Sequence, residues 1–563
     1  MSDPPVVAGL MLLAGVVFFA GITWGLPSRA VDPYLFGDHP VWSGAEIARL
    51  AGTRADDADR GADVDVNPLA RRDGQPIVLN ATDAQRAEII RRYRLYTYQP
   101  DEMITLMSLS KIRQNKGDPR LYQYGGLWVY PVGVLLKLSS MLGLIDLRAD
   151  VTYYLDHPEA FGRFYVVARA YSAAWGVAGV WAVFWITRRL TGPGSLIAPI
   201  TAALCYTFMP VVVNMAHEAK PHLPGAVLML FAVMAATKYV ETGRTRWWVW
   251  TGVACGAAFG MVLSAMWAFA VIPVMVMLRK DDPWRRRVVV MFGAGAIGLA
   301  VYFATNPYVL VNALTNPEPL RSNLANSKAM YAVHDLGAGV VNAAWLIAEG
   351  ASPFLALLGV VGCAVLVWRR VGRGRQGACD TDCAGRGDVG WLLLFPGALI
   401  VAQFASLAAG KPGEYGRFAL FVDVALAVAA VTGLDTLAKT TRQRVGLAIV
   451  GVLVTAPFGI DYLRAFLRDT RPVTSRLAAA EQVRRLPDRP LDVGVLDEPA
   501  PYVMPPVDLF RHRVVLVPSG PDPWRRCDVL VGPLARVMPH KRRRLKSISW
   551  ADIRVEVHRF NKP

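Results

Sequence analysis

The stretch "FGRFYVVARAYSAAWGVAGVWAVFWITRRLTG", residues 161–192, contains an apolar run over residues 164–187 that is long enough to cross a bilayer. A helix needs about 20 consecutive apolar residues to span a hydrocarbon core of about 30 Å. Arg169 is the one charged residue inside this run, and Arg188 and Arg189 close it. The stretch therefore predicts a membrane-spanning helix.

Similar runs recur along the whole first part of the chain, which has 563 residues, of which 53% are hydrophobic. Eleven runs are long enough, or nearly long enough, to span; they lie at about 6–26, 164–187, 195–216, 223–240, 247–263, 264–278, 288–305, 351–368, 389–409, 418–438 and 445–460. A soluble protein of this size would not show such a pattern. We expect a mainly α fold, a polytopic helical bundle of about 11 spans.

The net charge of +17 would suggest nucleic acid as a partner of a soluble chain. Here most Lys and Arg residues flank apolar runs, where orientation in the membrane explains them better. The sequence therefore predicts membrane lipids as partners and excludes nucleic acid.

The run "LWVYPVGVLLKLSSMLGLI", residues 127–145, decides the orientation of everything after it. If it does not span and the N-terminus is cytoplasmic, the short cytoplasmic connections hold 18 basic residues and the outer connections after the second span hold 5. Making it a span would invert this bias and the positive-inside rule. With Lys137 and Pro131 inside it, we expect an interfacial or re-entrant helix on the outer face.

This orientation places the first loop (27–163) and the tail from residue 461 on the periplasmic or extracellular side. The tail shows short β-like stretches at 491–496, 513–518 and 527–532, separated by Pro-rich turns. We predict a transmembrane domain over 1–460 and a small outer α/β domain over 461–563.

Other polar segments carry weaker signals. The first loop holds an insertion at about 30–95, whose polar part, 53–75, has irregularly spaced aspartates that do not fit a calcium loop. Cys379 and Cys383 in "CDTDC" are a weak signal for a metal or redox pair, and "KRRRLK" at 541–546 suggests a solvated or headgroup-facing patch. The sequence assigns no cofactor and leaves a divalent metal open.

Five polar groups fall at the outer ends of the predicted spans, where ionisable residues commonly line a functional cavity. They are Asp101 and Glu102 in "YQPDEMITLMSLSK", "HEAKPH" from His217 to His222, "TNPYVLVN" from Thr305 to Asn312, "GEYGRF" from Gly413 to Phe418, and Arg169. Each also has an ordinary structural explanation. Acids after Pro100 suit the first turn of a helix, and Arg417 could reach the interface from a span end.

The segment "YQPDEMITLMSLSKIRQNKGDPRLYQYGGLWVYPVGVLLKLSSMLGL" resembles the first outer loop of the C-type glycosyltransferases, which use polyprenyl-phosphate sugars. The closest resemblance is to the protein O-mannosyltransferases and the transferase that adds aminoarabinose to lipid A. Residues 161–192, "MPVVVNMAHEAKPHLPGAVLMLFAVMAA" and "EYGRFALFVDVALAVAA" are similar to later segments of that family. A Lys-Pro frequent in the family is replaced by Tyr122 to Gly126, and a Thr-Lys-Gly by Ser264 to Trp267.

The resemblance implies transfer of a sugar from a polyprenyl-phosphate donor to a hydroxyl or amine of a lipid, glycan or protein acceptor. Asp101 would be the general base, with Glu102 as its partner or, as the alternative, the base itself. The expected donor-phosphate contacts are Arg417, Arg169, Lys220 and His217, with Tyr122, Tyr124 and Tyr415 as hydrogen-bond donors or sugar-stacking faces.

The expected location is a bacterial inner membrane, crossed many times, with the active site on the periplasmic side. Two other classes of function remain open: a transporter or flippase of lipid-linked saccharides, and a non-catalytic envelope assembly protein. The spans carry few charges and show no paired broken helices, which argues against the transporter.

Overall fold

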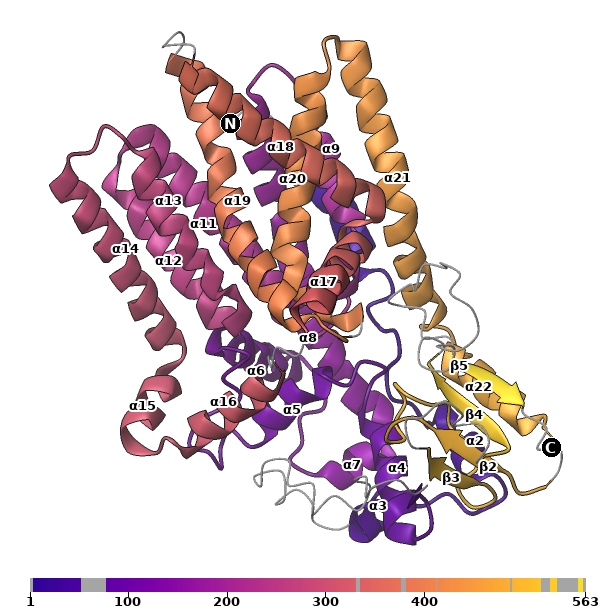
Figure 1. Ribbon diagram of the computed structural model, residues 1–563. Coiled ribbons are helices and arrows are strands. Elements are labelled where there is room, and N and C mark those ends of the chain that lie inside the picture. The colour runs from indigo at the N-terminus through magenta and orange to yellow at the C-terminus, as the bar shows by residue number, and fades with distance from the viewer. Residues whose placement is uncertain are drawn as a thin grey trace. The chain divides into compact units, whose positions relative to one another are not determined.

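The long apolar runs form helices in the computed structural model (Figure 1). The model describes residues 4–51, 77–330, 335–375, 381–411, 413–486, 489–517, 527–533 and 555–559. The helices on the predicted runs are α1 (Pro4–Phe19), α8 (Pro158–Thr191), α9 (Ile197–Thr207), α10 (Pro210–Ala216), α11 (His222–Thr242), α12 (Thr245–Met261), α13 (Val271–Leu278), α14 (Trp284–Thr305), α18 (Pro353–Arg375), α19 (Thr381–Leu407), α20 (Leu420–Leu437) and α21 (Thr441–Arg468). The prediction of a mainly α, polytopic fold is confirmed.

The expected count of eleven spans is not confirmed. Among the described residues, 6 helices are long and apolar enough to cross a membrane, or 8 if each bent helix pair is one span. One bent pair is α9 and α10, with an angle of 57°, and the other is α17 (Leu336–Ala351) and α18, with an angle of 107°. Hydropathy windows do not register such breaks, because a bend changes direction without changing composition. The same windows assigned residues 336–350 to an outer segment, whereas they form the apolar helix α17.

The chain divides into two compact units. We call residues 1–20, 111–134 and 169–463 the helical unit, and residues 21–110, 135–168 and 464–563 the sheet unit. The sheet unit thus combines much of the first loop with the C-terminal residues. The predicted division into a transmembrane domain (1–460) and an outer domain (461–563) stays a prediction.

The helical unit packs its helices closely where small residues face one another. Helices α11, α12 and α14 lie side by side, as do α18 and α20 (Figure 1). A Cβ atom added at Gly252 or Gly256 of α12 would lie 2.5 Å from the carbonyl oxygen of Ala294 or 2.1 Å from that of Gly298, both on α14. Backbones that approach so closely are typical of helix pairs in membranes.

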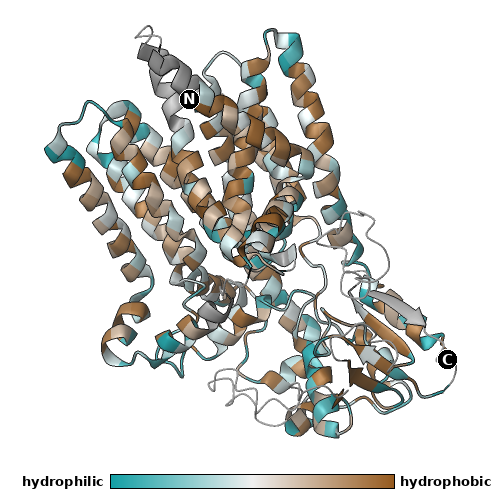
Figure 2. Cartoon of the chain, viewed as in Figure 1, coloured by the Kyte–Doolittle hydropathy of each residue, from teal (hydrophilic) through white to brown (hydrophobic). Residues whose placement is uncertain are grey.

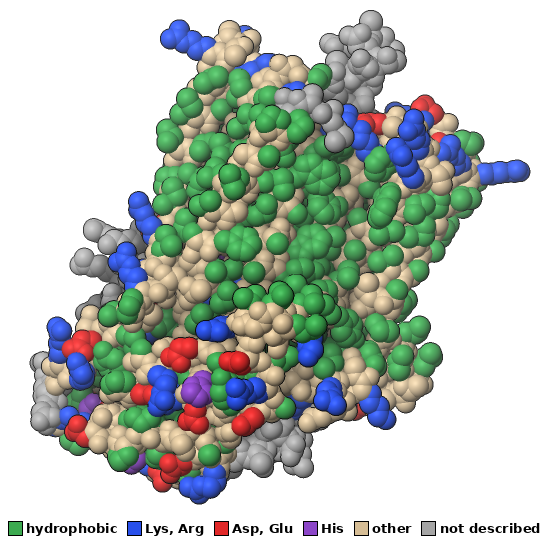
Figure 3. All heavy atoms as spheres, turned by 180° about the vertical axis from the view of Figure 1, so that it is seen from behind, with side chains coloured by type: hydrophobic (Ala, Val, Ile, Leu, Met, Phe, Trp, Pro, Cys, Tyr) green, Lys and Arg blue, Asp and Glu red, His purple; other side chains and the backbone are tan. Residues whose placement is uncertain are grey.

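The long helices carry the hydrophobic surface of the protein. Hydrophobic residues dominate them, with hydrophilic residues near their ends (Figure 2). A broad hydrophobic face follows the helices in Figure 3, and Lys and Arg side chains gather near helix ends. In α8, Glu159 lies in the first turn and Arg188 and Arg189 in the last, as the helix dipole favours.

The sheet unit contains a five-stranded sheet of order β1-β3-β2-β4-β5. Its strands are β1 (Ile77–Val78), β2 (Asp492–Val495), β3 (Arg513–Leu516), β4 (Val529–Pro533) and β5 (Val555–Arg559). Strand β2 pairs in parallel with β3 and β4, and the edge strands β1 and β5 run antiparallel to their neighbours. The three strands predicted in the tail are therefore present, and the first loop supplies a fourth.

The sheet unit also contains six helices: α2 (Asp32–Phe36), α3 (Gly44–Ala51), α4 (Asp83–Leu95), α5 (Glu102–Ser110), α7 (Val151–Asp156) and α22 (Ser475–Arg484). Helix α4 begins with a capping box, in which the Thr82 hydroxyl accepts from the Gln85 backbone N–H and the Gln85 side chain accepts from the Thr82 N–H. The described part of the predicted insertion at 30–95 is therefore built into the unit.

Helix α6 (Gly126–Met141) is the helix predicted to lie at the interface. It has 16 residues, contains Pro131, and belongs to the apolar helices too short to pass as spans. Its place relative to a bilayer stays a prediction. The polar segment 53–75, Cys379, the side chain of Cys383, and the basic patch 541–546 lie outside the described residues.

Candidate active site

The two acids of the Pro-Asp-Glu motif lie in different environments at the start of α5. Glu102 is fully buried, and its Oε2 accepts a hydrogen bond of 2.6 Å from the Thr97 hydroxyl. Its backbone N–H donates to the Gln99 carbonyl at 3.3 Å. Asp101, one residue earlier, is partly exposed. Glu102 therefore holds the turn together, and Asp101 is the acid that water or a substrate can reach.

The residues before the acids are anchored inside the sheet unit. The guanidinium of Arg476 lies 4.3 Å from the centroid of the Tyr98 ring, and the Tyr98 hydroxyl bonds to Thr474. Burial raises the pKa of Tyr98 to about 12. Tyr98 therefore stays a neutral phenol. Its contacts with Thr474 and Arg476 fix the position of the residues just before Asp101.

In the helical unit, residues 123–125 run antiparallel to residues 261–263. The Gly125 N–H donates to the Met261 carbonyl at 3.0 Å, and the Leu263 N–H donates to the Gln123 carbonyl at 3.1 Å. A Cβ atom at Gly125 would lie 1.9 Å from the Gly260 carbonyl oxygen, and one at Gly126 would lie 1.9 Å from that of Thr305. Only glycine fits here, so the segment that replaces the family's Lys-Pro packs directly on backbone.

The "NPY" motif supports this segment. The Asn306 Oδ1 accepts from the Gly126 N–H at 2.7 Å, at the end of α14. In addition, Trp267, in the segment that replaces the family's Thr-Lys-Gly, donates through Nε1 to Gln403 Oε1 at 2.6 Å. In both segments that differ from the family, at Tyr122–Gly126 and Ser264–Trp267, residues therefore make packing contacts with other segments of the helical unit.

The hydroxyl of Tyr122 is engaged within the protein. It donates to Asp118 Oδ2 at 2.8 Å and accepts from Asn312 Nδ2 at 2.6 Å, while the same Nδ2 lies 2.7 Å from Asp118 Oδ2. Burial and the Asp118 carboxylate raise the pKa of Tyr122. This network ties the first loop to α15 (Pro307–Thr315) and favours an anchoring role over the predicted substrate contact.

Tyr124 takes part in a cluster of aromatic and cationic side chains, which we call the aromatic–cation cluster: Tyr124, His222, Tyr415, Arg417 and Phe418. The His222 ring meets Tyr124 and Phe418 edge to face, with centroids 5.8 Å and 5.3 Å away. The Arg417 guanidinium lies 5.4 Å from the Tyr415 centroid and 5.3 Å from that of Phe418. Three segments distant in sequence thus meet at one place.

The 3₁₀ helix η4 (Gly413–Ala419) supplies three members of the aromatic–cation cluster, and the start of α11 supplies His222. Arg417 is only 7% exposed. A guanidinium on aromatic faces keeps its planar donors in a defined orientation. The aromatic–cation cluster can therefore hold a phosphate or a sugar ring.

Lys220 is paired inside the helical unit. It is fully buried, and its Nζ lies 3.0 Å from Glu218 Oε2. Glu218 Oε1 also accepts from Asn214 Nδ2 at 3.0 Å, and the Ser172 hydroxyl donates to the Lys220 carbonyl at 3.0 Å. A buried pair of this kind balances its own charge. Lys220 is therefore a weaker candidate for the donor phosphate than Arg417.

Arg169 and His217 are fully buried as well. The ring nitrogens of His217 lie 2.7 Å from the Val213 carbonyl oxygen and 2.7 Å from that of Ala20. Burial has the largest influence on the pKa of His217 and lowers it, as does the charge of Arg169. The two carbonyl oxygens favour the charged ring and raise the pKa, and the result is a pKa of about 4. His217 therefore joins α1 to α10 as a neutral residue.

Sequence reasoning singled out the motifs but assigned no site role to several residues within them. His222 and Phe418 belong to quoted motifs, and their roles depend on contacts between segments. Asp423 of α20 is fully buried, and a Cβ atom at Gly350 would lie 2.7 Å from its Oδ2. A carboxyl inside an apolar helix is the signal that could have marked it.

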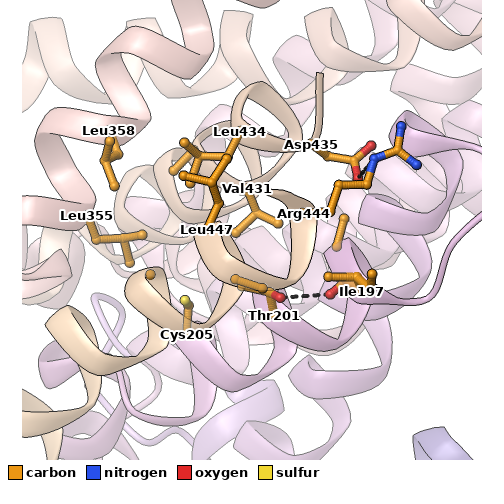
Figure 4. Close-up of a pocket in the computed structure, with 14 residues that line it drawn as sticks. Ile197, Thr201, Cys205, Leu355, Leu358, Val431, Leu434, Asp435, Arg444 and Leu447 are labelled. Carbon is orange, nitrogen blue, oxygen red and sulfur yellow. Dashed lines mark hydrogen bonds and ion pairs between the residues drawn. The ribbon is translucent and has the colours of Figure 1, made fainter. Parts of the chain in front are cut away.

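An apolar cavity lies among α9, α18, α20 and α21, lined by Thr201, Cys205, Leu355, Val431 and Leu447 (Figure 4). Asp435 and Arg444 form an ion pair of 3.3 Å beside it. Its volume of about 20 Å³ holds little more than one water molecule. It is therefore too small to hold a lipid chain as it stands. Within the described residues, no group of three or more His, Cys, Asp or Glu side chains could hold a metal ion.

Comparison with known proteins gives a family match over the first part of the helices. Residues 159–308 match the family model described as dolichyl-phosphate-mannose-protein mannosyltransferase. No curated protein matches the sequence.

Three solved structures are similar to this chain at low identity. ArnT from Cupriavidus metallidurans bound to undecaprenyl phosphate has a TM-score of 0.43 and 16% identity, over 71% of this chain and 70% of that chain. AglB from Archaeoglobus fulgidus in complex with an inhibitory peptide and a dolichol-phosphate has a TM-score of 0.41 and 12% identity, over 86% and 58%. The Pmt1-Pmt2 complex of S. cerevisiae bound to the sugar donor has a TM-score of 0.32 and 13% identity, over 56% and 34%.

The family match covers α8 to the end of α14, which follow the Pro-Asp-Glu loop in the chain. It agrees with the resemblance that this loop shows. Over residues 159–308 the chain is therefore similar to the family described as dolichyl-phosphate-mannose-protein mannosyltransferase.

Proposed function

We propose that this protein transfers a sugar from a polyprenyl phosphate to a hydroxyl or amine of an acceptor on the periplasmic side of a bacterial inner membrane. The observation that carries the proposal is the aromatic–cation cluster, in which the buried Arg417 is held over two aromatic rings. Such a cluster suits a ligand that joins a phosphate to a sugar.

In the proposed reaction, the acceptor oxygen or nitrogen attacks the anomeric carbon of the donor sugar. The bond between that carbon and the phosphate oxygen breaks, and the polyprenyl phosphate leaves with the electron pair. Asp101 takes the proton of the acceptor, because it is the more accessible acid of the motif. Arg417 stabilises the charge that grows on the phosphate.

Glu102 is a positioning residue in this proposal. Its carboxylate is buried against Thr97 and holds the turn that presents Asp101. The tyrosine rings of the aromatic–cation cluster, Tyr124 and Tyr415, offer faces for the sugar. We no longer assign Tyr122 or His217 to the substrate, because their polar atoms bond within the protein.

The test compares Asp101→Asn with Glu102→Gln in the full-length protein, purified into lipid nanodiscs and supplied with labelled polyprenyl-phosphate sugars and a membrane extract as acceptor. We expect Asp101→Asn to lower kcat by about 10²- to 10⁴-fold, with an unchanged melting temperature. Glu102→Gln is expected to lower the melting temperature more than it lowers kcat.

Asp83→Asn, an exposed acid of α4 in the same unit, serves as the matched control. Undiminished transfer by Asp101→Asn would remove Asp101 from its role. Loss of transfer in the control would show that the assay reports on folding of the unit rather than on chemistry.

A further inference from the structure

A second cavity, which is polar, lies inside the sheet unit. The proposed reaction does not use it. It has a volume of about 290 Å³, close to the ~300 Å³ at which small-molecule sites begin. Its walls are α2 with the turn that follows, α22, and residues 506–512 before β3. We call it the α2–α22 pocket; its polar lining consists of Tyr34, Asp38, Arg484, Asp508, Arg511 and His512.

The walls of the α2–α22 pocket are held in place by contacts behind it. The Leu509 N–H donates to the Leu35 carbonyl at 3.0 Å. The Phe510 ring stacks on His39, with centroids 3.7 Å apart. Asn80 donates to the carbonyls of Leu509 and His512 at 2.7 Å and 2.8 Å. The pocket is therefore formed before any ligand binds.

The acceptor groups of the pocket are placed by the backbone. Asp508 Oδ1 accepts from the backbone N–H groups of Phe510 and Arg511, both at 3.0 Å. A Cβ atom at Gly37 would lie 1.9 Å from Asp508 Oδ2, and Gly37 has a φ of +54°, which favours glycine. The Asp508 carboxylate is thus fixed against the turn that carries Asp38.

The donor groups are defined as well. His512 Nδ1 accepts from the Leu491 N–H at 3.3 Å, and burial lowers the pKa of His512. The neutral ring therefore carries its proton on Nε2, which can donate. Arg484 lies over the Tyr34 ring at 5.5 Å and pairs with Glu481 Oε2 at 2.6 Å, which orients its guanidinium.

Two guanidinium groups and two carboxylates line the pocket, so their charges balance. The two carboxylates would repel an anion, and an apolar molecule would displace water from these polar groups without offering them a hydrogen bond. A sugar hydroxyl both donates and accepts, which complements carboxylates beside guanidinium and imidazole N–H groups, and the Tyr34 ring offers a face for a sugar ring. We propose that the α2–α22 pocket binds a neutral saccharide.

The identification of this saccharide with the acceptor rests on the proposed function, whereas the binding itself does not. A glycan held in the sheet unit would raise the local concentration of acceptor ends for the reaction. The proposal therefore names a neutral glycan, rather than a protein or lipid headgroup, as the acceptor class.

The binding test uses isothermal titration calorimetry of the full-length protein in nanodiscs with a panel of neutral hexoses, pentoses and their oligosaccharides, and with inorganic phosphate. The variant is Arg484→Ala. Its matched control is Arg485→Ala. Arg485 is the residue directly after α22; it is exposed and pairs with the same Glu481 but does not line the pocket.

We expect at least one neutral saccharide to bind the wild type, Arg484→Ala to weaken that binding by about 10-fold, and Arg485→Ala to leave it unchanged. Absence of binding by every saccharide in the panel would overturn the proposal. Equal weakening by the two variants, or binding of phosphate in place of saccharide, would overturn it too.

A kinetic experiment separates this proposal from the proposed function. If the pocket holds the acceptor, Arg484→Ala raises KM for a glycan acceptor and leaves kcat and the KM for the donor unchanged. If the wild type transfers no sugar at all, the proposed function fails, and the calorimetry still decides whether the pocket binds saccharide.

Discussion

Asp101 and Glu102 are neighbours in the chain, and their different burial separates their roles at the residue scale. The fully buried carboxylate of Glu102 accepts a hydrogen bond from the Thr97 hydroxyl and so stabilises the turn. A partly exposed one can exchange protons with a bound acceptor. This difference in burial supports the proposal that Asp101 is the base and Glu102 a positioning residue.

Arg417 gives a prediction about the donor phosphate. Arg417→Ala removes both the charge and the planar donors, and we expect kcat/KM for the donor to fall about 10²-fold. Arg417→Lys keeps the charge without the fork and is expected to recover only part of the activity. Steady-state kinetics with labelled donor measures both. Arg321→Ala, an arginine of α16 (Glu318–Met330), is the control, and wild-type kinetics in Arg417→Ala would exclude the assigned contact.

His217 gives a prediction about pH. Its folded pKa of about 4 lies below the ordinary value of 6.5, so the stability it contributes is present above pH 6.5 and is lost as the pH falls toward 4. We expect the melting temperature of the wild type to fall more steeply between pH 6.5 and 4.5 than that of His217→Gln. Parallel curves for the two proteins, measured by scanning fluorimetry, would contradict a neutral buried imidazole.

At the element scale, residues 118–126 of the helical unit are held to other segments of that unit by backbone contacts and by a polar network. Residues 123–125 pair with residues 261–263, and Tyr122, Asp118 and Asn312 bond to one another. These contacts place Tyr124 against His222. The geometry of the aromatic–cation cluster therefore depends on the backbone pairing of residues 123–125 with residues 261–263.

The glycine at position 126 provides the test of this packing. Gly126→Ala would bring a methyl group to 1.9 Å from the Thr305 carbonyl oxygen, so the loop has to shift. We expect a loss of about 1–3 kcal/mol in stability, read as a lower melting temperature, together with a loss of transfer. Gly295→Ala on α14, where a Cβ atom meets nothing within 4 Å, is the matched control. Equal melting temperatures for both variants would show that the close contact carries no energy.

For the whole molecule, the charge bias of the connections predicts the orientation in the membrane. A single cysteine at Asp281, between α13 and α14, should react with a membrane-impermeant maleimide only after the cells are permeabilised. A single cysteine at Asn316, after α15, should react in intact spheroplasts. Both are placed in a background without the native cysteines. The reverse labelling pattern would show the opposite orientation in the membrane. It would also contradict the proposal that the reaction takes place on the periplasmic side.

The helical nature of the chain, its apolar runs and the three strands of the tail could be predicted from the sequence, because hydropathy and β propensity act over a few neighbouring residues. The expectation that the spans hold no paired broken helices was wrong, because two helix pairs are bent by 57° and 107°. The span count could not be predicted, since some of the predicted runs, such as Pro4–Phe19 and Leu263–Leu278, form apolar helices that are too short to pass as spans. The strand β1 could not either, because Ile77 and Val78 form a strand only by pairing with β3.

The sequence by itself determined that this is a many-helix membrane protein with an acidic motif at the start of α5 and a small sheet at its end. Only the tertiary structure decided that Glu102 is buried and that the Tyr122 hydroxyl donates to Asp118. It also decided that Tyr124, His222 and Phe418 meet beside Arg417. The physical reason is the range of the interactions. Composition sets where a segment is stable, whereas a side chain's partner comes from whichever distant segment packs against it.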